Sequence, residues 1–235
     1  MPWVSRQAVK TWLLPDGVMA DKHSAYRKFF IFLLLIALVL GLLVASFLAD
    51  RVVLFADPNL ELEIRKLLGE ETKPIRQSHL LSFIDLDLSG KKISDISGLE
   101  HFRNLEVLNL ENNFIKDLSP LESLNNLTSL NISNNGITDL EEVRLDSLTH
   151  LPLVELQLNS TEVLSSVGRR NRISDINLLG HFHKLQVLEI QGNLVSEISA
   201  LSGLQKLADL NLRENQIQDI TPLENLKSLE EVDLS

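Results

Sequence analysis

The stretch LEVLNLENNFIKDLSPLESL, residues 105–124, decides the fold. Its first half alternates apolar and polar residues, which is typical of a short strand with one buried face. Its second half spaces its leucines by three, which favours a tight helical or 3₁₀ return. Nearly the same phrase begins again at positions 127, 185 and 207, each time with an asparagine eight residues further on. The chain is therefore a repeat protein.

Six units of this pattern follow one another, and a partial seventh covers residues 228–235. The six units span residues 82–103, 104–125, 126–151, 152–183, 184–205 and 206–227. Four of them have 22 residues, while the third and fourth carry insertions of 4 and 10 residues, the second of these at about 161–170. A single unit cannot bury its apolar face alone, so the units must stack. The pattern predicts an α/β solenoid, a curved parallel β-sheet with short helical or 3₁₀ returns.

An asparagine recurs at the corner between the two halves of the unit. Backbone amide and carbonyl groups leave the sheet there and need partners in the interior, and an asparagine side chain offers both a donor and an acceptor. Lys91 takes this position in the first unit. The predicted structural ladder consists of Asn113, Asn135, Asn171, Asn193 and Asn215.

These repeats resemble the internalin-type leucine-rich repeats of bacterial surface proteins, over residues 52–235. The segment ADPNLELEIRKLLGEETKPI is similar to the capping segment at the start of such arrays. Asp57 is expected to cap a helix that begins at Pro58 and ends at Gly69. Residues 50–81 are thus a connector and a helical cap. The apolar stripe predicted to cover the first coil consists of Leu60, Ile64, Leu67 and Leu68.

Residues 29–49 form a run of 21 positions without a charge. As a helix this run would be about 31 Å long, the thickness of the hydrocarbon core of a bilayer, and it predicts one transmembrane helix. Lys22, Arg27 and Lys28 precede it, so residues 1–28 are expected in the cytoplasm and the repeats outside the cytoplasmic membrane. The alternative is a cleaved signal peptide, with residues 44–46 as the cleavage site.

The composition narrows the possible functions. The net charge is −10, and the residues after position 50 carry all of that excess, which argues against a nucleic-acid partner. The chain has no cysteine, which excludes disulfides, thiol nucleophiles and thiolate metal sites. Phosphate-binding glycine motifs, nucleophile elbows and zinc-binding helix motifs are absent from the sequence. The sequence therefore predicts no catalytic residue, no cofactor and no metal site.

Two sets of residues raise a metal hypothesis. His181 and His183 flank Phe182, but Phe182 aligns with a core position, which favours two solvent-facing loop histidines. An acidic residue also recurs once per unit, where a return begins and free N–H groups need acceptors, so capping is favoured over calcium binding. This acidic column consists of Asp95, Asp117, Asp139, Asp175, Glu197 and Asp219.

The residues between the core leucines of each strand are expected to face the concave side of the solenoid. Seven of these fourteen are acidic and none is basic, which predicts a basic protein partner, with a merely solvated face as the alternative. The alternation assigns to this face Asp85, Asp87, Val107, Asn109, Ser129, Asn131, Glu155, Gln157, Val187, Glu189, Asp209, Asn211, Glu231 and Asp233. Phe114 and Leu194 form a more apolar rim. The insertion, with Arg169, Arg170 and Arg172, is either a binding loop or an inert bulge.

The leading hypothesis is a membrane-anchored, non-enzymatic leucine-rich-repeat protein that displays an acidic binding surface outside the cytoplasmic membrane. The connector of residues 50–56 reaches at most about 25 Å, so a membrane-proximal partner is expected. The alternative is a structural subunit or the N-terminal part of a larger assembly. Its last coil, with Leu229, Val232 and Leu234, would then dock a partner or a further domain.

Overall fold

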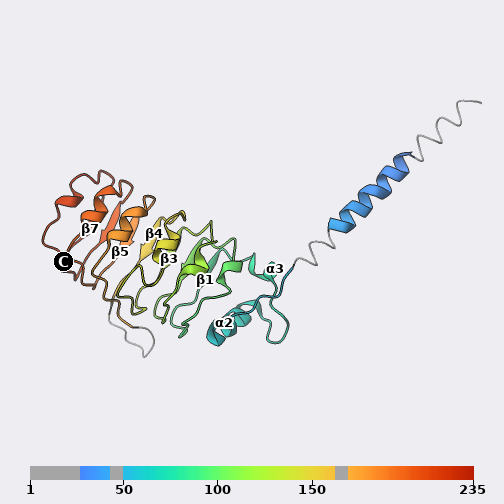
Figure 1. Cartoon of the computed structure of the whole chain (residues 1–235), viewed down its shortest axis with the longest axis horizontal. Coiled ribbons are helices and arrows are strands. Elements are labelled where there is room, and N and C mark those ends of the chain that lie inside the picture. Colours follow the sequence, from blue (N-terminus) through green and yellow to red (C-terminus); the bar gives the residue numbers. More distant parts are fainter. Residues whose placement is uncertain (1–26, 43–49, 162–168) are drawn as a thin grey trace, which may run out of the picture. The chain divides into compact units, whose positions relative to one another are not determined.

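The computed structural model describes residues 27–42, 50–161 and 169–235. The chain divides into two compact units, Met1–Arg51 and Val52–Ser235. In the first unit the structure describes a helix over residues 27–42, drawn in blue in Figure 1, and residues 50 and 51. The second unit contains the β-sheet, and each unit is described by itself.

The helix of the first unit covers part of the predicted spanning segment. The prediction for residues 29–49 extends into residues 43–49, which lie outside the described residues, as do residues 1–26 of the predicted cytoplasmic segment. Among the helices that the structure describes, none has both the length and the apolarity that a membrane crossing requires.

The second unit is built on a seven-stranded parallel sheet whose strands lie in chain order. Each strand pairs with the next in register, so that Leu86 lies opposite Leu108 and Leu108 opposite Leu130. The strands are β1 (Asp85–Asp87), β2 (Val107–Asn109), β3 (Ser129–Asn131), β4 (Glu155–Gln157), β5 (Val187–Glu189), β6 (Asp209–Asn211) and β7 (Glu231–Asp233). The predicted parallel sheet is confirmed.

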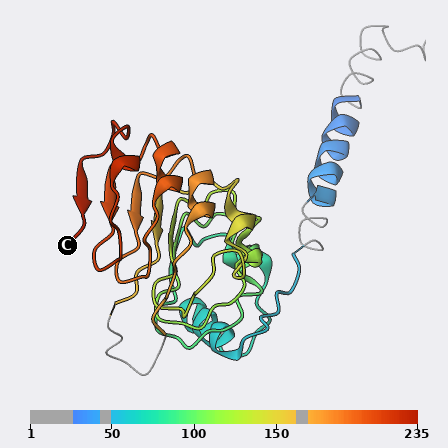
Figure 2. The same cartoon turned by 60° about the vertical axis from the view of Figure 1, so that its left-hand side comes forward.

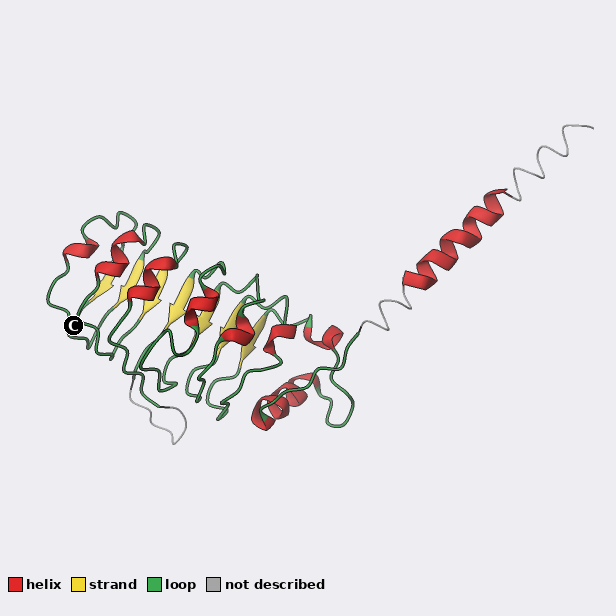
Figure 3. Ribbon diagram, viewed as in Figure 1, coloured by secondary structure: helices red, strands yellow, loops and turns green. Residues whose placement is uncertain are grey.

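Short 3₁₀ helices return the chain between the strands and form a second row beside the sheet (Figure 3). They are η1 (Leu99–His101), η2 (Ser119–Leu121), η3 (Leu145–Leu148), η4 (Asn177–His181), η5 (Ser199–Gly203) and η6 (Thr221–Leu223). Prolines at the first turns of η2 and η6 suit these positions, because a backbone N–H in the first turn of a helix has no acceptor within the helix and proline lacks that N–H. The predicted short returns are confirmed.

One continuous apolar core runs through the coils between the sheet and the 3₁₀ helices. Each middle strand residue from Leu86 to Leu210 is buried, and so are the leucines of the returns, such as Leu99 and Leu121. The coils are therefore joined by shared side-chain packing as well as by the sheet, as expected for stacked repeats.

Two helices close the first coil, α2 (Pro58–Leu68) and α3 (Gln77–Leu80). The side chain of Asp57 accepts hydrogen bonds from the backbone at the start of α2, and Gly69 ends the helix in a left-handed conformation (φ 65°). Leu60 and Ile64 are fully buried and Leu68 packs against the core. The prediction for Leu67 is wrong, because its side chain is 53% exposed. It lies just outside the stripe that faces the coil.

Candidate functional site

The outward face of the sheet brings together the side chains that alternate with the buried strand leucines. The register aligns them into two columns that cross the sheet, one beginning at Asp85 and Val107 and the other at Asp87 and Asn109. Asp85, Asp87, Val107 and Glu231 are exposed, and the other ten predicted positions are partly exposed. Figure 2 shows the strands of this sheet side by side. We call these fourteen residues the strand face.

Hydrogen bonds hold the carboxylates at the centre of the strand face in place. Glu155 accepts from Ser129 Oγ (3.0 Å) on one oxygen and from Gln157 Nε2 (2.6 Å) on the other. Glu189 accepts from Asn159 Nδ2 (2.7 Å). Hydrogen bonds to a charged acceptor are the stronger kind, and they fix the orientation of these two groups before any partner arrives.

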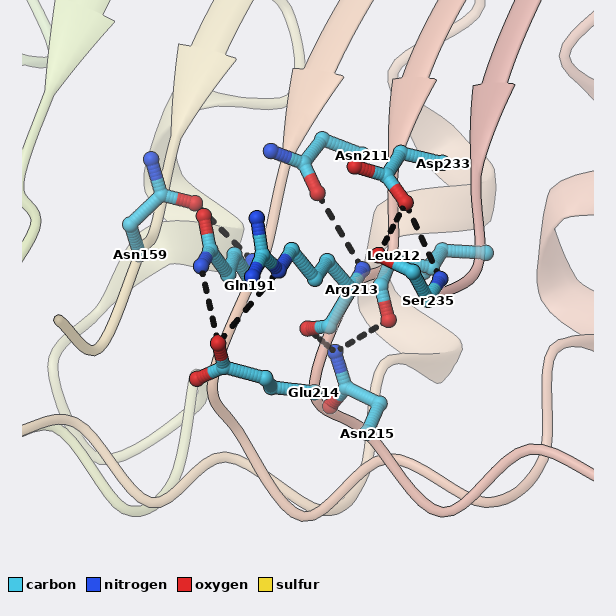
Figure 4. Close-up of polar contacts among 9 residues, drawn as sticks. All are labelled: Asn159, Gln191, Asn211, Leu212, Arg213, Glu214, Asn215, Asp233 and Ser235. Atoms are coloured by element: carbon cyan, nitrogen blue, oxygen red, sulfur yellow. Dashed lines mark hydrogen bonds and ion pairs between the residues drawn. The ribbon is translucent and has the colours of Figure 1, made fainter.

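A third column of outward side chains extends this face past the strand ends. Its members follow the second column by two residues in each coil, but the sequence prediction did not include them. Figure 4 shows its members Asn159, Gln191 and Arg213. The backbone N–H of Gln191 donates to Asn159 Oδ1 (2.9 Å), and its side chain donates to Glu214 (3.5 Å). Arg213 pairs with Glu214 at 3.4 Å. The strand pattern continued by one step would have found these positions and the basic residue among them.

The asparagine column lies at the corner after the strands and ties successive coils together. Asn113 Nδ2 donates to Leu88 O and Leu110 O, both at 2.9 Å, and its Oδ1 accepts from the N–H of Ile93 at 2.9 Å. The other four asparagines bond in the same way to their own coil and the preceding one. The side chains thereby supply the partners that the corner backbone lacks.

Five of the six carboxylates of the acidic column act within local turns, and the sixth, Glu197, is exposed. Asp95, Asp117, Asp139, Asp175 and Asp219 each accept a hydrogen bond of 2.8 to 2.9 Å from the N–H two residues further on. The N–H and the hydroxyl of Thr221 lower the pKa of Asp219. Among residues 27–42, 50–161 and 169–235, no group of three or more metal-binding side chains is close enough to hold an ion.

The remaining predicted features are exposed side chains around the coils. His181 and His183 are exposed beside the buried Phe182, and the side chain of Leu194 is 36% exposed. Arg169 and Arg170 are exposed at the end of the insertion, whose residues 162–168 lie outside the described part of the chain. Arg172 is exposed as well. Among the described residues, no hydrogen bond or ion pair links these side chains to those of the strand face.

Comparison with known proteins identifies the repeats. Residues 84–123 match the family model of leucine-rich repeats (2 copies). The chain contains leucine-rich repeats. No curated protein matches. An internalin (inlF) from Listeria monocytogenes has 35% sequence identity and a TM-score of 0.63, and the match covers 74% of this chain and 48% of that chain.

A leucine-rich-repeat protein from Leptospira interrogans is also similar in structure. It has 27% identity and a TM-score of 0.52, and the match covers 65% of this chain and 37% of that chain. The leucine-rich-repeat chain thus spans less than half of the length of either solved structure. What the repeats share with both is the solenoid of stacked strands and short returns.

Proposed function

We propose that the strand face binds a basic protein partner and that the protein has no catalytic role. The observation that carries this proposal is the register, which aligns fourteen outward positions of which seven are acidic and none is basic. Such a surface attracts a positively charged partner and disfavours an acidic one. Leucine-rich repeats present extended surfaces of this kind to other macromolecules.

The central carboxylates favour binding further because they are already oriented. Glu155 and Glu189 keep their positions through Ser129, Gln157 and Asn159, so little side-chain freedom is lost when a partner docks. Arg213 at the edge is paired with Glu214 and leaves the centre acidic. A lysine or arginine of the partner would lie over β4 and β5.

The second part of the proposal is that residues 29–49 anchor the protein in the cytoplasmic membrane. Support comes from the uncharged sequence, from the helix over residues 27–42 and from the basic residues that precede it. In this arrangement the N-terminus lies in the cytoplasm and the repeats lie outside. The short connector then favours a partner in or near the same membrane.

Charge reversal tests the binding surface. We expect the variant Glu155→Lys, Glu189→Lys, Asp209→Lys to lose binding and to keep its fold, because all three side chains are partly exposed. A photo-crosslinking residue at Val187, which lies opposite Glu155 in the register, should capture a basic protein in native membranes, and the same residue in the triple variant should not. The matched control is Glu122→Lys, Asp146→Lys, Glu224→Lys, which makes the same charge change at exposed positions of the 3₁₀ returns. Equal capture by both variants would move the site away from the strand face.

Carbonate extraction tests the anchor. Membranes from cells that make the full chain should retain it, whereas the variant Leu35→Lys, Val39→Lys should be released, because a charge at the centre of a bilayer costs about 3 kcal/mol. Leu35→Ala, Val39→Ala is the control and should stay in the membrane. Release of the unaltered chain would contradict the anchor.

A second candidate function is docking of a further domain or subunit on the last coil. Exposed apolar side chains at this end of the array favour it: Val232 takes the place of a buried leucine but is 37% exposed, and Ile220 of the preceding coil is 52% exposed. Light scattering of the native protein distinguishes the candidates. A monomer whose intact mass ends at Ser235 would count against docking of this kind.

A further inference from the structure

The carboxylates are unevenly distributed over the strand face. Each of the four strands from β4 to β7 carries at least one, whereas β2 and β3 carry none. The outward residues of these two neutral strands are Val107, Asn109, Ser129 and Asn131. Because the strands lie in chain order, the acidic part of the face is an unbroken run over β4–β7, and the two carboxylates of β1 lie apart from it.

Along this run the carboxylates alternate between the two columns of the strand face. Glu155 and Asp209 belong to the first column, Glu189 lies between them in the second, and Asp233 continues the second column on β7. Glu231 adds a carboxylate to the first column on β7. Neighbouring strands are about 4.8 Å apart and successive outward side chains of one strand about 6.6 Å apart, so these groups form a zigzag about 14 Å long. We call these five residues the acidic row.

The acidic row is open to a partner. Glu231 is exposed and the other four side chains are partly exposed. None of the five forms an ion pair within the described part of the chain. The N–H and the hydroxyl of Ser235 lower the pKa of Asp233, which favours its charged form. The row therefore offers a negative charge on each of the four strands.

A helix fits the acidic row better than an extended segment does. In a helix, residues i, i+3, i+7 and i+10 lie on one side and span about 15 Å. Their directions alternate by about 60° and 40°, which at a helix radius of about 5.5 Å shifts them sideways by about 4 to 6 Å. In an extended segment, the side chains of one side recur about every 6.6 Å in a straight line, so that only three of them fit along the row and none alternates.

We propose that the acidic row binds a basic helix of the protein partner, which lies across β4–β7 and presents one lysine or arginine to each strand. This inference rests on the proposed function of the strand face and adds the shape of the partner segment. Val187 lies between Glu155 and Asp209 in the first column and is partly exposed, so it gives the helix an apolar contact. Docking of an amphipathic helix on a complementary surface is a recurring mode of recognition.

Fluorescence anisotropy of labelled peptides with the full chain in a neutral detergent tests the helix. The stripe peptide, Ala-Ala-Lys-Ala-Ala-Lys-Ala-Ala-Ala-Lys-Ala-Ala-Lys-Ala-Ala, places all its lysines on one side of a helix. The spread peptide, Ala-Ala-Lys-Ala-Lys-Ala-Ala-Ala-Ala-Ala-Lys-Ala-Lys-Ala-Ala, has the same composition but points them to different sides. The third probe is the stripe peptide with its central alanine replaced by proline, which breaks the helix.

The stripe peptide should bind at least about tenfold more tightly than either of the other two, because only its helix brings all four lysines to the row. The measurement is made in about 0.15 M salt, where attraction between exposed charges more than about 8 Å apart is screened. Equal binding of the three peptides would overturn the helix, and so would no binding of the stripe peptide at millimolar concentration.

Substitutions locate the helix on the row. Glu189→Gln and Asp209→Asn should each weaken the stripe peptide about threefold, because each removes one carboxylate that a lysine contacts. Glu224→Gln removes an equal charge at an exposed position beside the 3₁₀ return η6 and should leave the affinity unchanged. Asp85→Asn removes a charge from the same face on β1 and should have less effect than either substitution in the row. An equal effect of Asp85→Asn and Glu189→Gln would overturn the placement on β4–β7.

These results are distinct from a failure of the proposed function. Crosslinked capture of a basic protein at Val187, together with equal binding of the three peptides, would retain binding at the strand face and remove the helix. Loss of capture together with equal binding of the peptides would remove both.

Discussion

Asp57 and Ser94 join the cap to the first coil. Asp57 Oδ2 accepts from the N–H of Ser94 at 2.7 Å and from its hydroxyl at 3.1 Å, while Oδ1 accepts from the N–H groups of Asn59 and Leu60 in the first turn of α2. A single buried carboxylate therefore starts the helix and fastens it to the solenoid. The sequence predicts the first role from the Asp-Pro pair, but the second requires a contact between residues 37 positions apart.

Asp57→Ala is expected to lower the free energy of unfolding by about 2 kcal/mol, since it removes a helix cap and leaves buried N–H groups without an acceptor. Urea denaturation of residues 51–235 measures this change. Asp87→Ala is the matched control, because Asp87 is exposed and accepts only from the N–H of Ser89. The control should stay within about 0.5 kcal/mol of the unaltered protein. Equal losses in the two variants would contradict the role of Asp57.

The same carboxylate makes stability depend on pH. Burial raises the pKa of Asp57, but the hydrogen bonds from Ser94, Asn59 and Asp95 together lower it by more. The pKa of Asp57 is therefore below its ordinary value. A carboxyl group with a lowered folded pKa stabilises the fold above its unfolded pKa of about 3.9, and this contribution is lost as the pH falls through the folded value. Asp57→Asn should therefore be less stable than the unaltered chain at pH 7. The difference should shrink below about pH 4 in denaturation curves, and a constant difference from pH 7 to pH 3 would argue against it.

Asn135 tests the asparagine column in the middle of the array. Its amide donates to Leu110 O, Ile132 O and Ser133 O at 3.0 to 3.1 Å and accepts from the N–H of Ile115 at 2.9 Å. Asn135→Ala should lower the free energy of unfolding by about 1 to 3 kcal/mol, because buried backbone groups lose their partners. Asn125→Ala, at an exposed position with one bond to Ser123 O, is the control. An unchanged melting curve for Asn135→Ala would show that the column does not hold the coils.

The repeat period made most of the fold predictable. Leu108 and Leu130 take the same position of the 22-residue unit, which predicts that their strands pair in parallel. The register shows the two leucines opposite each other. The spacing of the repeats also reveals the four-residue and ten-residue insertions, but not the approach of Arg169 to Gly136, because the spacing of residues along the chain does not say how an irregular loop packs. The sequence does not predict the exposure of Leu67 either. Which residues at the edge of the apolar stripe of α2 are buried depends on the angle at which the helix packs on the first coil.

Gly192 is a position where the fold requires glycine, and the repeat pattern alone does not show why. Its φ is +72°, and a Cβ there would lie 2.1 Å from the backbone oxygen of Ser160 in the preceding coil. Gly192→Ala should therefore cost at least about 2 kcal/mol, from the left-handed conformation and from the forced shift of the backbone. Gly203→Ala is the matched control, because no atom lies within 4 Å of its added Cβ and its φ is not positive.

Thermal unfolding should show a lower Tm for Gly192→Ala and an unchanged or slightly higher Tm for Gly203→Ala, since alanine reduces the freedom of the unfolded chain. Equal Tm values would mean that the coil at Ser160 moves aside freely, which the hydrogen bonds from Gly192 N–H to Arg213 O and from Ser160 N–H to Gln191 O oppose.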